Sequence, residues 1–211
     1  MPFLLSHAFS VHRGIRRGAS RLLGMAILVG ALTSSQAVFA TSFNVADGQR
    51  HQRWQSLTAS LGGERHVRAL ENTSYSDTLL SINATAGHCA IHWLELRSRL
   101  GERQSRSEVV NRVPVDILVD EQTAQTGTAV LSTQRGDDGL YVHVEDLDMP
   151  LLESRLSTGS TLHLRLRMTE KESDYWFLSF SLAGADEALS RLNRLCTQEA
   201  GDSSDSPSIS P

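Results

Sequence analysis

The sequence predicts an all-β domain, an antiparallel β-sandwich or half-open barrel of 7–8 short strands with one short inserted helix and a C-terminal helix. Three observations support this fold class. Apolar and polar residues alternate along several short segments. Turn-forming residues separate these segments. Apolar spacing typical of a helix occurs only after Asp148 and after Gly184.

The first forty residues have the organisation of a secretory signal peptide. Four arginines precede an apolar run over residues 22–32, and Ala37 to Ala40 offer a cleavage site after Ala40. A membrane-spanning helix needs about 20 apolar residues, and lengthening this run would bury the polar residues 33–36. We therefore predict cleavage, no stable membrane span afterwards, and a periplasmic or secreted protein. An uncleaved anchor is the alternative.

The chain between residues 41 and 111 contains two recognisable strands. Residues 41–70 are polar with scattered apolar positions, and they predict only a short strand or helix near Trp54. The large apolar residues of 78–82 and 89–96 predict strands. Residues 98–111 are charged, so we expect an exposed connection.

Three strands and a helix are predicted between residues 113 and 159. Residues 113–119 place valine and isoleucine on one face, but Pro114 cannot donate to a ladder, which favours an edge strand or a strand's first residues. The turn at residues 136–139 predicts a hairpin of strands 128–133 and 140–145. Asp148 can cap a helix over 150–156, and Gly159 ends it.

The last third of the chain is the most regular. Residues 162–168 and 175–182 alternate with a period of two and predict two strands. Residues 185–196 predict a helix with one apolar stripe. The Ser/Asp/Pro-rich residues 197–211 predict a disordered tail. The predicted organisation is thus a signal peptide (1–40), one β-rich domain (41–196) and a tail (197–211).

The charge balance argues against nucleic-acid binding. The 211 residues include 20 basic and 24 acidic side chains, a formal charge of −4. Cleavage after Ala40 would remove four basic residues and no acidic one, which leaves 16 basic and 24 acidic side chains, a charge of −8. Proteins that bind phosphate backbones need a basic surface instead.

An exported domain with two cysteines predicts one disulfide, between Cys89 and Cys196. The alternative is a metal site that uses His88, Cys89 and His92. A structural zinc site needs four ligands, and a strand over residues 88–92 would point Cys89 away from both histidines. We therefore expect a disulfide, no metal and no cofactor.

The end of the chain resembles small periplasmic accessory proteins. The resemblance lies within residues 112–196, in the short helix at Pro150, the strands 162–166 and 176–184, the helix 188–192 and Cys196. This pattern is similar to that of type VI secretion accessory proteins of the VasI kind and of the invasion-associated locus B group. It implies a non-enzymatic accessory role in the bacterial envelope.

The sequence contains no Gly-x-Ser-x-Gly, His-Glu-x-x-His or Cys-x-x-Cys motif and no phosphate-binding glycine loop, so we expect no enzyme. We expect instead a binding module for another envelope protein, in a secretion or host-interaction system. The predicted partner-binding face consists of His143, His163, Arg165, Arg167, Tyr175 and Phe177. The alternative is a small periplasmic hydrolase or ligand-binding protein that uses His143 and His163, on neighbouring strands, with nearby carboxylates.

Overall fold

A computed structural model describes residues 44–61, 64–169 and 174–202. The predicted signal peptide (1–40) and the last nine residues of the predicted tail (203–211) lie outside the described residues.

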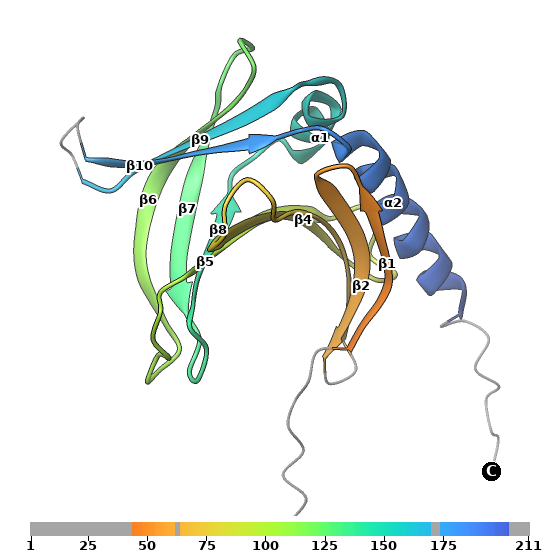
Figure 1. The fold of residues 1–211 in the computed structure, drawn as a ribbon, viewed down its shortest axis with the longest axis horizontal. Helices are drawn as coiled ribbons and strands as arrows, with labels where there is room; N and C mark the ends of the chain where they lie inside the picture. Colours follow the sequence, from red (N-terminus) through yellow and green to blue (C-terminus); the bar gives the residue numbers. More distant parts are fainter. Residues whose placement is uncertain (1–43, 62–63, 170–173, 203–211) are drawn as a thin grey trace, which may run out of the picture. The chain divides into compact units, whose positions relative to one another are not determined.

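Ten antiparallel strands form one open, curved sheet (Figure 1). In chain order they are β1 (Asn44–His51), β2 (Trp54–Leu61), β3 (Glu64–Glu71), β4 (Thr78–Thr85), β5 (His92–Arg99), β6 (Glu108–Val119), β7 (Gln125–Thr133), β8 (Gly139–Glu145), β9 (Thr161–Arg167) and β10 (Tyr175–Ser181). In space the order is β1-β2-β3-β4-β5-β8-β7-β6-β9-β10. The all-β class is confirmed, but the prediction of a sandwich of 7–8 strands is wrong.

The predicted number of strands is too low mainly because the segment in which only a short strand or helix near Trp54 was predicted contains three strands, β1, β2 and β3. The buried side of β2 starts with Trp54 and continues with Ser56 and Thr58, and the buried side of β3 ends with Glu71. Polar residues at buried positions remove the apolar alternation by which strands are recognised. The hairpin of β7 and β8 and the strands β9 and β10 keep that alternation and were predicted within a few residues.

Pro114 lies inside the sheet, so the prediction of an edge strand is wrong. Strand β6 pairs with β7 on one side and with β9 on the other. Its pairing with β9 begins only at Val115, however, so Pro114 has a neighbouring strand on the β7 side alone. A residue without an N–H group is tolerated there. Strand β6 also begins at Glu108, inside the charged segment expected to be a connection.

One side of the sheet, here called the apolar face, carries the core. Every second residue of strands β4 to β10 contributes to it, for example Ile82, Leu94, Val144, Leu164 and Phe180, all almost completely buried. The regular alternation on β9 and β10 makes this face continuous up to the last strand.

Two helices pack on the apolar face and against each other, α1 (Met149–Thr158) and α2 (Ala185–Asp202) (Figure 1). As predicted, Asp148 caps α1, where its Oδ1 accepts a hydrogen bond of 3.0 Å from the Leu151 N–H. Helix α2 continues six residues beyond the predicted end at Cys196. Neither helix in the described ranges combines the length and apolarity that crossing a bilayer would require.

The two ends of the sheet meet where β10 approaches the β1–β2 turn. The indole N–H of Trp54 donates to the Ser181 carbonyl at 2.8 Å, and the Arg53 N–H donates to the Ala183 carbonyl at 3.1 Å. Gly184 follows with φ of +92°, and a Cβ atom there would overlap the carbonyl group of His51. Only glycine allows this close approach of two backbone segments.

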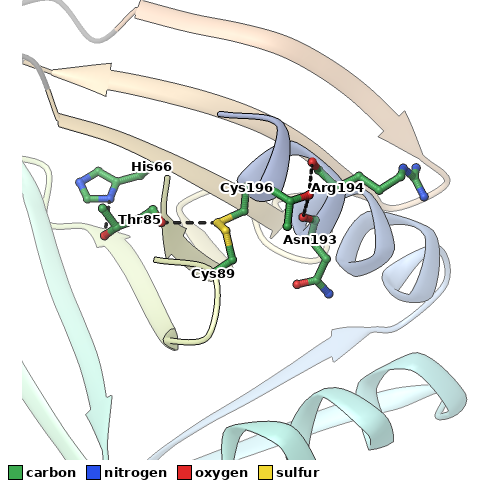
Figure 2. The surroundings of a disulfide bond; sticks show 7 residues. His66, Thr85, Cys89, Asn193, Arg194 and Cys196 are labelled. Carbon is green, nitrogen blue, oxygen red and sulfur yellow. Dashed lines mark hydrogen bonds between the residues drawn. A yellow bond between two sulfur atoms is a disulfide. The ribbon is translucent and has the colours of Figure 1, made fainter. Parts of the chain in front are cut away.

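The predicted pair Cys89–Cys196 is confirmed, with the two Sγ atoms 2.05 Å apart (Figure 2). It connects α2 to the turn between β4 and β5, and the Cys196 Sγ lies 3.5 Å from the Thr85 carbonyl oxygen. Residues 88–91 form a turn rather than a strand, so the predicted alternation of His88, Cys89 and His92 is wrong. Among the described residues, no three His, Cys, Asp or Glu side chains gather as a metal site would require.

Candidate functional site

The side of the sheet opposite the core, here called the polar face, carries all six residues predicted to bind a partner. The ladder registers place on it Glu95 of β5, His143 of β8, Asp116 of β6 and the odd-numbered residues of β9 and β10. Burial agrees with this placement, because on β9 the even-numbered leucines are buried and the odd-numbered residues are not.

The six predicted residues fall into two groups. His143 lies on β8, and strands β7 and β6 separate it from β9. The prediction that His143 and His163 lie on neighbouring strands is therefore wrong, because the β7–β8 hairpin inserts between β5 and β6. The other five residues lie together on the β9–β10 hairpin and are here called the hairpin surface: His163, Arg165, Arg167, Tyr175 and Phe177.

The hairpin surface presents two aromatic rings to solvent. Tyr175 is 49% exposed and Phe177 is 50% exposed. Each is paired across the ladder with an arginine, Tyr175 with Arg167 and Phe177 with Arg165. Exposed large aromatic side chains beside arginines are the composition that protein interfaces favour.

Asp116 organises the two arginines. Its Oδ2 accepts a hydrogen bond of 2.7 Å from Arg165, its Oδ1 lies 3.5 Å from Arg167, and the Thr126 hydroxyl donates to it at 3.0 Å. Partial burial alone would raise the pKa of Asp116, but the hydrogen bonds from Arg165 and Thr126 and the charge of Arg167 lower it below its ordinary value. Because two guanidinium groups share one carboxylate, N–H donors remain for a partner.

A pocket of about 240 Å³ opens beside the Phe177 ring. Its lining consists of Asp116, Leu118, Ala124, His163, Arg165 and Phe177. The His163 ring stacks on Phe177 with centroids 5.5 Å apart, and the buried His163 Nδ1 has no hydrogen-bond partner among the described residues. This pocket is large enough for one apolar or aromatic side chain of a partner.

His143 faces a second and larger cavity, here called the central cavity, of about 590 Å³. Its lining consists of Arg68, Glu95, Ser132, Gln134, Arg135, Gly136, Asp137, Tyr141 and His143. Arg68 Nη2 lies 3.5 Å from Glu95 Oε1, and Glu95 is the cross-strand neighbour of His143.

Two buried polar atoms close to this cavity have no partner among the described residues. Arg68 and Asn83 are directly opposite each other on β3 and β4. The Nε donor of Arg68 and the Oδ1 acceptor of Asn83 are both buried and both without a hydrogen bond. Buried polar atoms are usually paired, so a water molecule or a polar ligand group would stabilise this arrangement.

One wall of the central cavity is an ion-pair network around Asp137. Arg97 Nη2 donates to Asp137 at 2.6 Å and to Asp138 at 2.8 Å, and the Tyr141 hydroxyl donates to Asp137 at 3.0 Å. Burial acts to raise the pKa of Asp137, but the hydrogen bonds from Arg97, the Gly139 N–H and Tyr141 lower it below its ordinary value. Burial is the main reason that the pKa of Tyr141 is raised.

Sequence reasoning missed the central cavity except for His143. Residues 136–139 were predicted to form a turn. Arg68, Glu95 and Tyr141 come from β3, β5 and β8, and no local sequence pattern reveals how these strands pair. His92, considered as a metal ligand, instead hydrogen-bonds through Nδ1 to Glu153 of α1 at 2.6 Å.

No protein-family model, no curated protein and no solved structure matches this chain.

Proposed function

We propose that the protein is an exported, non-enzymatic binding module that engages another protein of the bacterial envelope through the hairpin surface. The observation that carries the proposal is the pair of half-exposed rings, Tyr175 and Phe177, beside Arg165, Arg167 and an apolar pocket. The resemblance to envelope accessory proteins of secretion or host-interaction systems supports the same role.

The chemistry of the hairpin surface suits a protein partner. Aromatic rings supply apolar contact area at a low cost in side-chain entropy, and arginine supplies several fixed N–H donors. The Cys89–Cys196 disulfide supports export, because such bonds are typical of oxidising compartments. A partner covering Phe177 would also cover the pocket and shield the His163–Phe177 stack from water.

Photo-crosslinking in intact cells tests the proposal. A photoreactive phenylalanine analogue would replace Phe177, Tyr175 or, as a control, Asn44, an exposed residue at the start of β1, at the end of that strand away from the β1–β2 turn. We expect a discrete adduct from positions 175 and 177 that disappears when Arg165 and Arg167 are both replaced by glutamine. Equal adducts from all three positions, or none, would contradict the proposal.

The central cavity favours a second candidate function, binding or hydrolysis of a small polar ligand. The specific observation is His143 next to Glu95 in a cavity of about 590 Å³, close to the unpaired Arg68 Nε and Asn83 Oδ1. A thermal-shift screen of small carboxylates, amines and sugars tests it. A stabilising compound that no longer acts on a His143→Ala variant supports this function, and the absence of any such compound counts against it.

A further inference from the structure

We propose that the partner adds an extended segment as an eleventh strand to the free edge of β10, at Tyr175 and Phe177. This inference rests on the proposed function and specifies how the partner binds: through backbone hydrogen bonds, with apolar side chains at alternate positions packing on the two exposed rings.

Strand β10 has only β9 as a neighbour in the sheet, so half of its backbone groups point outward. The hydrogen bonds fix which half. Met168 N–H donates to the Asp174 carbonyl at the start of the hairpin, and the ladder alternates from there. The even-numbered residues 176, 178 and 180 therefore bond to β9, and Tyr175, Phe177, Ser179 and Ser181 direct their N–H and C=O groups away from it.

The second half of this edge is already occupied. The Ser179 N–H donates to the Tyr75 hydroxyl at 2.9 Å, the Ser181 N–H donates to the Ser74 hydroxyl at 3.3 Å, and the Ser181 carbonyl accepts from Trp54. The buried Glu71 carboxylate holds the Ser74 loop in place by accepting from its N–H at 2.9 Å.

The first half of the edge is unoccupied within the described residues. The outward N–H and C=O groups of Tyr175 and Phe177 have no hydrogen-bond partner there. These groups recur every second residue, about 6.8 Å apart, which is the repeat that an added antiparallel strand matches. The two exposed rings stand on the same face, where side chains of the added strand would contact them.

The opposite edge of the sheet does not offer the same template. Strand β1 has a bulge between Ala46 and Gln49, Asp47 has φ of +56°, and its carbonyl accepts a hydrogen bond of 2.6 Å from Arg191. Bulges of this kind prevent strand addition.

The register argues for a separate segment rather than a second copy of this chain. Two antiparallel β10 strands centred on Trp176 would pair Tyr175 with Phe177 of the other copy, and Asp174 of that copy with Leu178. Tyr75 already occupies the place beside the next residue, Ser179. A short extended segment can end opposite Leu178, whereas the chain of a second copy does not end at Asp174.

The test is selection of a phage-displayed library of random twelve-residue peptides on the purified, oxidised protein. The matched variants Phe177→Ala and Phe177→Pro distinguish the contribution of the aromatic ring to peptide affinity from that of the backbone N–H. Both variants remove the ring, and only proline removes the outward N–H. That N–H is not part of the ladder with β9, so the hairpin is retained. We expect enriched peptides with alternating apolar residues and affinity for Phe177→Pro about tenfold below that for Phe177→Ala, the effect of one lost hydrogen bond.

Amide hydrogen exchange of the wild-type protein provides a second readout that does not depend on the folding of the proline variant. We expect the Tyr175 and Phe177 amides to become protected when a selected peptide binds. Equal affinity of a selected peptide for the two variants, without amide protection, overturns strand addition. A library that yields no binder overturns it as well. In either case, adducts from positions 175 and 177 in cells would still support the proposed function. Concentration-dependent dimerisation that Phe177→Pro abolishes would assign the edge to a second copy and also overturn the proposal.

Discussion

The two faces of the sheet differ in what holds them together. The apolar face is a continuous core of aliphatic and aromatic side chains, covered by α1 and α2, and the Cys89–Cys196 disulfide connects α2 to the β4–β5 turn. Between β5 and β9 the polar face is held by ion pairs centred on Asp116 and Asp137, and this face carries the pocket beside Phe177, the central cavity and the exposed rings of β10.

Because of this difference, we expect the apolar face to determine the stability of the fold and the polar face to determine partner recognition. Apolar burial contributes about 25 cal/mol per Å² of surface removed from water, whereas exposed ion pairs contribute at most about 1 kcal/mol each. Substitutions on the apolar face should therefore change the free energy of unfolding and leave partner binding intact in the folded molecules. Substitutions on the hairpin surface should do the opposite.

The largest effect on stability is expected from removing the disulfide. In the double variant Cys89→Ala, Cys196→Ala, the unfolded chain regains the entropy of a loop of about 107 residues, and we expect a loss of about 4–5 kcal/mol in the free energy of unfolding. Urea unfolding of the oxidised protein and the variant measures this loss. Ser190→Ala, at an exposed position on α2, is the control. A loss under about 1 kcal/mol would mean that apolar contacts alone hold α2.

The most direct test of the comparison uses two phenylalanines of the same strand. Phe180 is fully buried on the apolar face and Phe177 is 50% exposed on the polar face. We expect Phe180→Ala to lower the free energy of unfolding by about 3–4 kcal/mol and Phe177→Ala to lower it by less than about 1 kcal/mol. Crosslinking from position 175 should persist in folded Phe180→Ala and be reduced in Phe177→Ala. Similar effects of both variants on the free energy of unfolding would show that the two faces contribute equally to stability.

The same difference explains which parts of the fold could be predicted. Strand β9 could be predicted because leucines alternate with histidine and arginines, and β10 because Trp176, Leu178 and Phe180 recur at every second position. In β2 and β3 the buried side carries Ser56, Thr58 and Glu71, whose burial depends on contacts from α2 and the β3–β4 loop rather than on their own polarity.

The candidate site also has a part that could be predicted from the sequence and a part that could not. The hairpin surface could be predicted because its five residues lie on two strands that are consecutive in the sequence and pair with each other in the sheet. Placing His143 required the order β5-β8-β7-β6, which depends on long-range pairing. The free half of the β10 edge also escaped prediction, because it is defined by Tyr75, 100 or more residues away along the chain.

A smaller effect, dependent on pH, is expected from the Asp137 network. The pKa of folded Asp137 lies below its ordinary value of about 3.9, so on acidification the unfolded chain binds the proton first. The stabilisation is therefore present above about pH 4 and is lost as the pH falls through the folded-state pKa. Urea unfolding at pH 6 and pH 3 should show that Asp137→Asn loses about 1 kcal/mol at pH 6 and less at pH 3. Asp174→Asn, at an exposed position, is the control, and a loss that is equal at both pH values would exclude the mechanism.

The smallest effect on stability is expected from Arg167→Gln on the hairpin surface. Arg167 is 44% exposed and lies 3.5 Å from Asp116, which keeps its shorter bond to Arg165, so the free energy of unfolding should change by less than about 0.5 kcal/mol. The yield of the adduct from position 175 should nevertheless fall severalfold, because Arg167 is the cross-strand neighbour of Tyr175. Arg112→Gln, which removes an exposed ion pair with Glu145 on the same face, is the matched control and should leave the yield unchanged. If both variants reduce the yield equally, the partner responds to the charge of the whole polar face, and the hairpin surface has no special role.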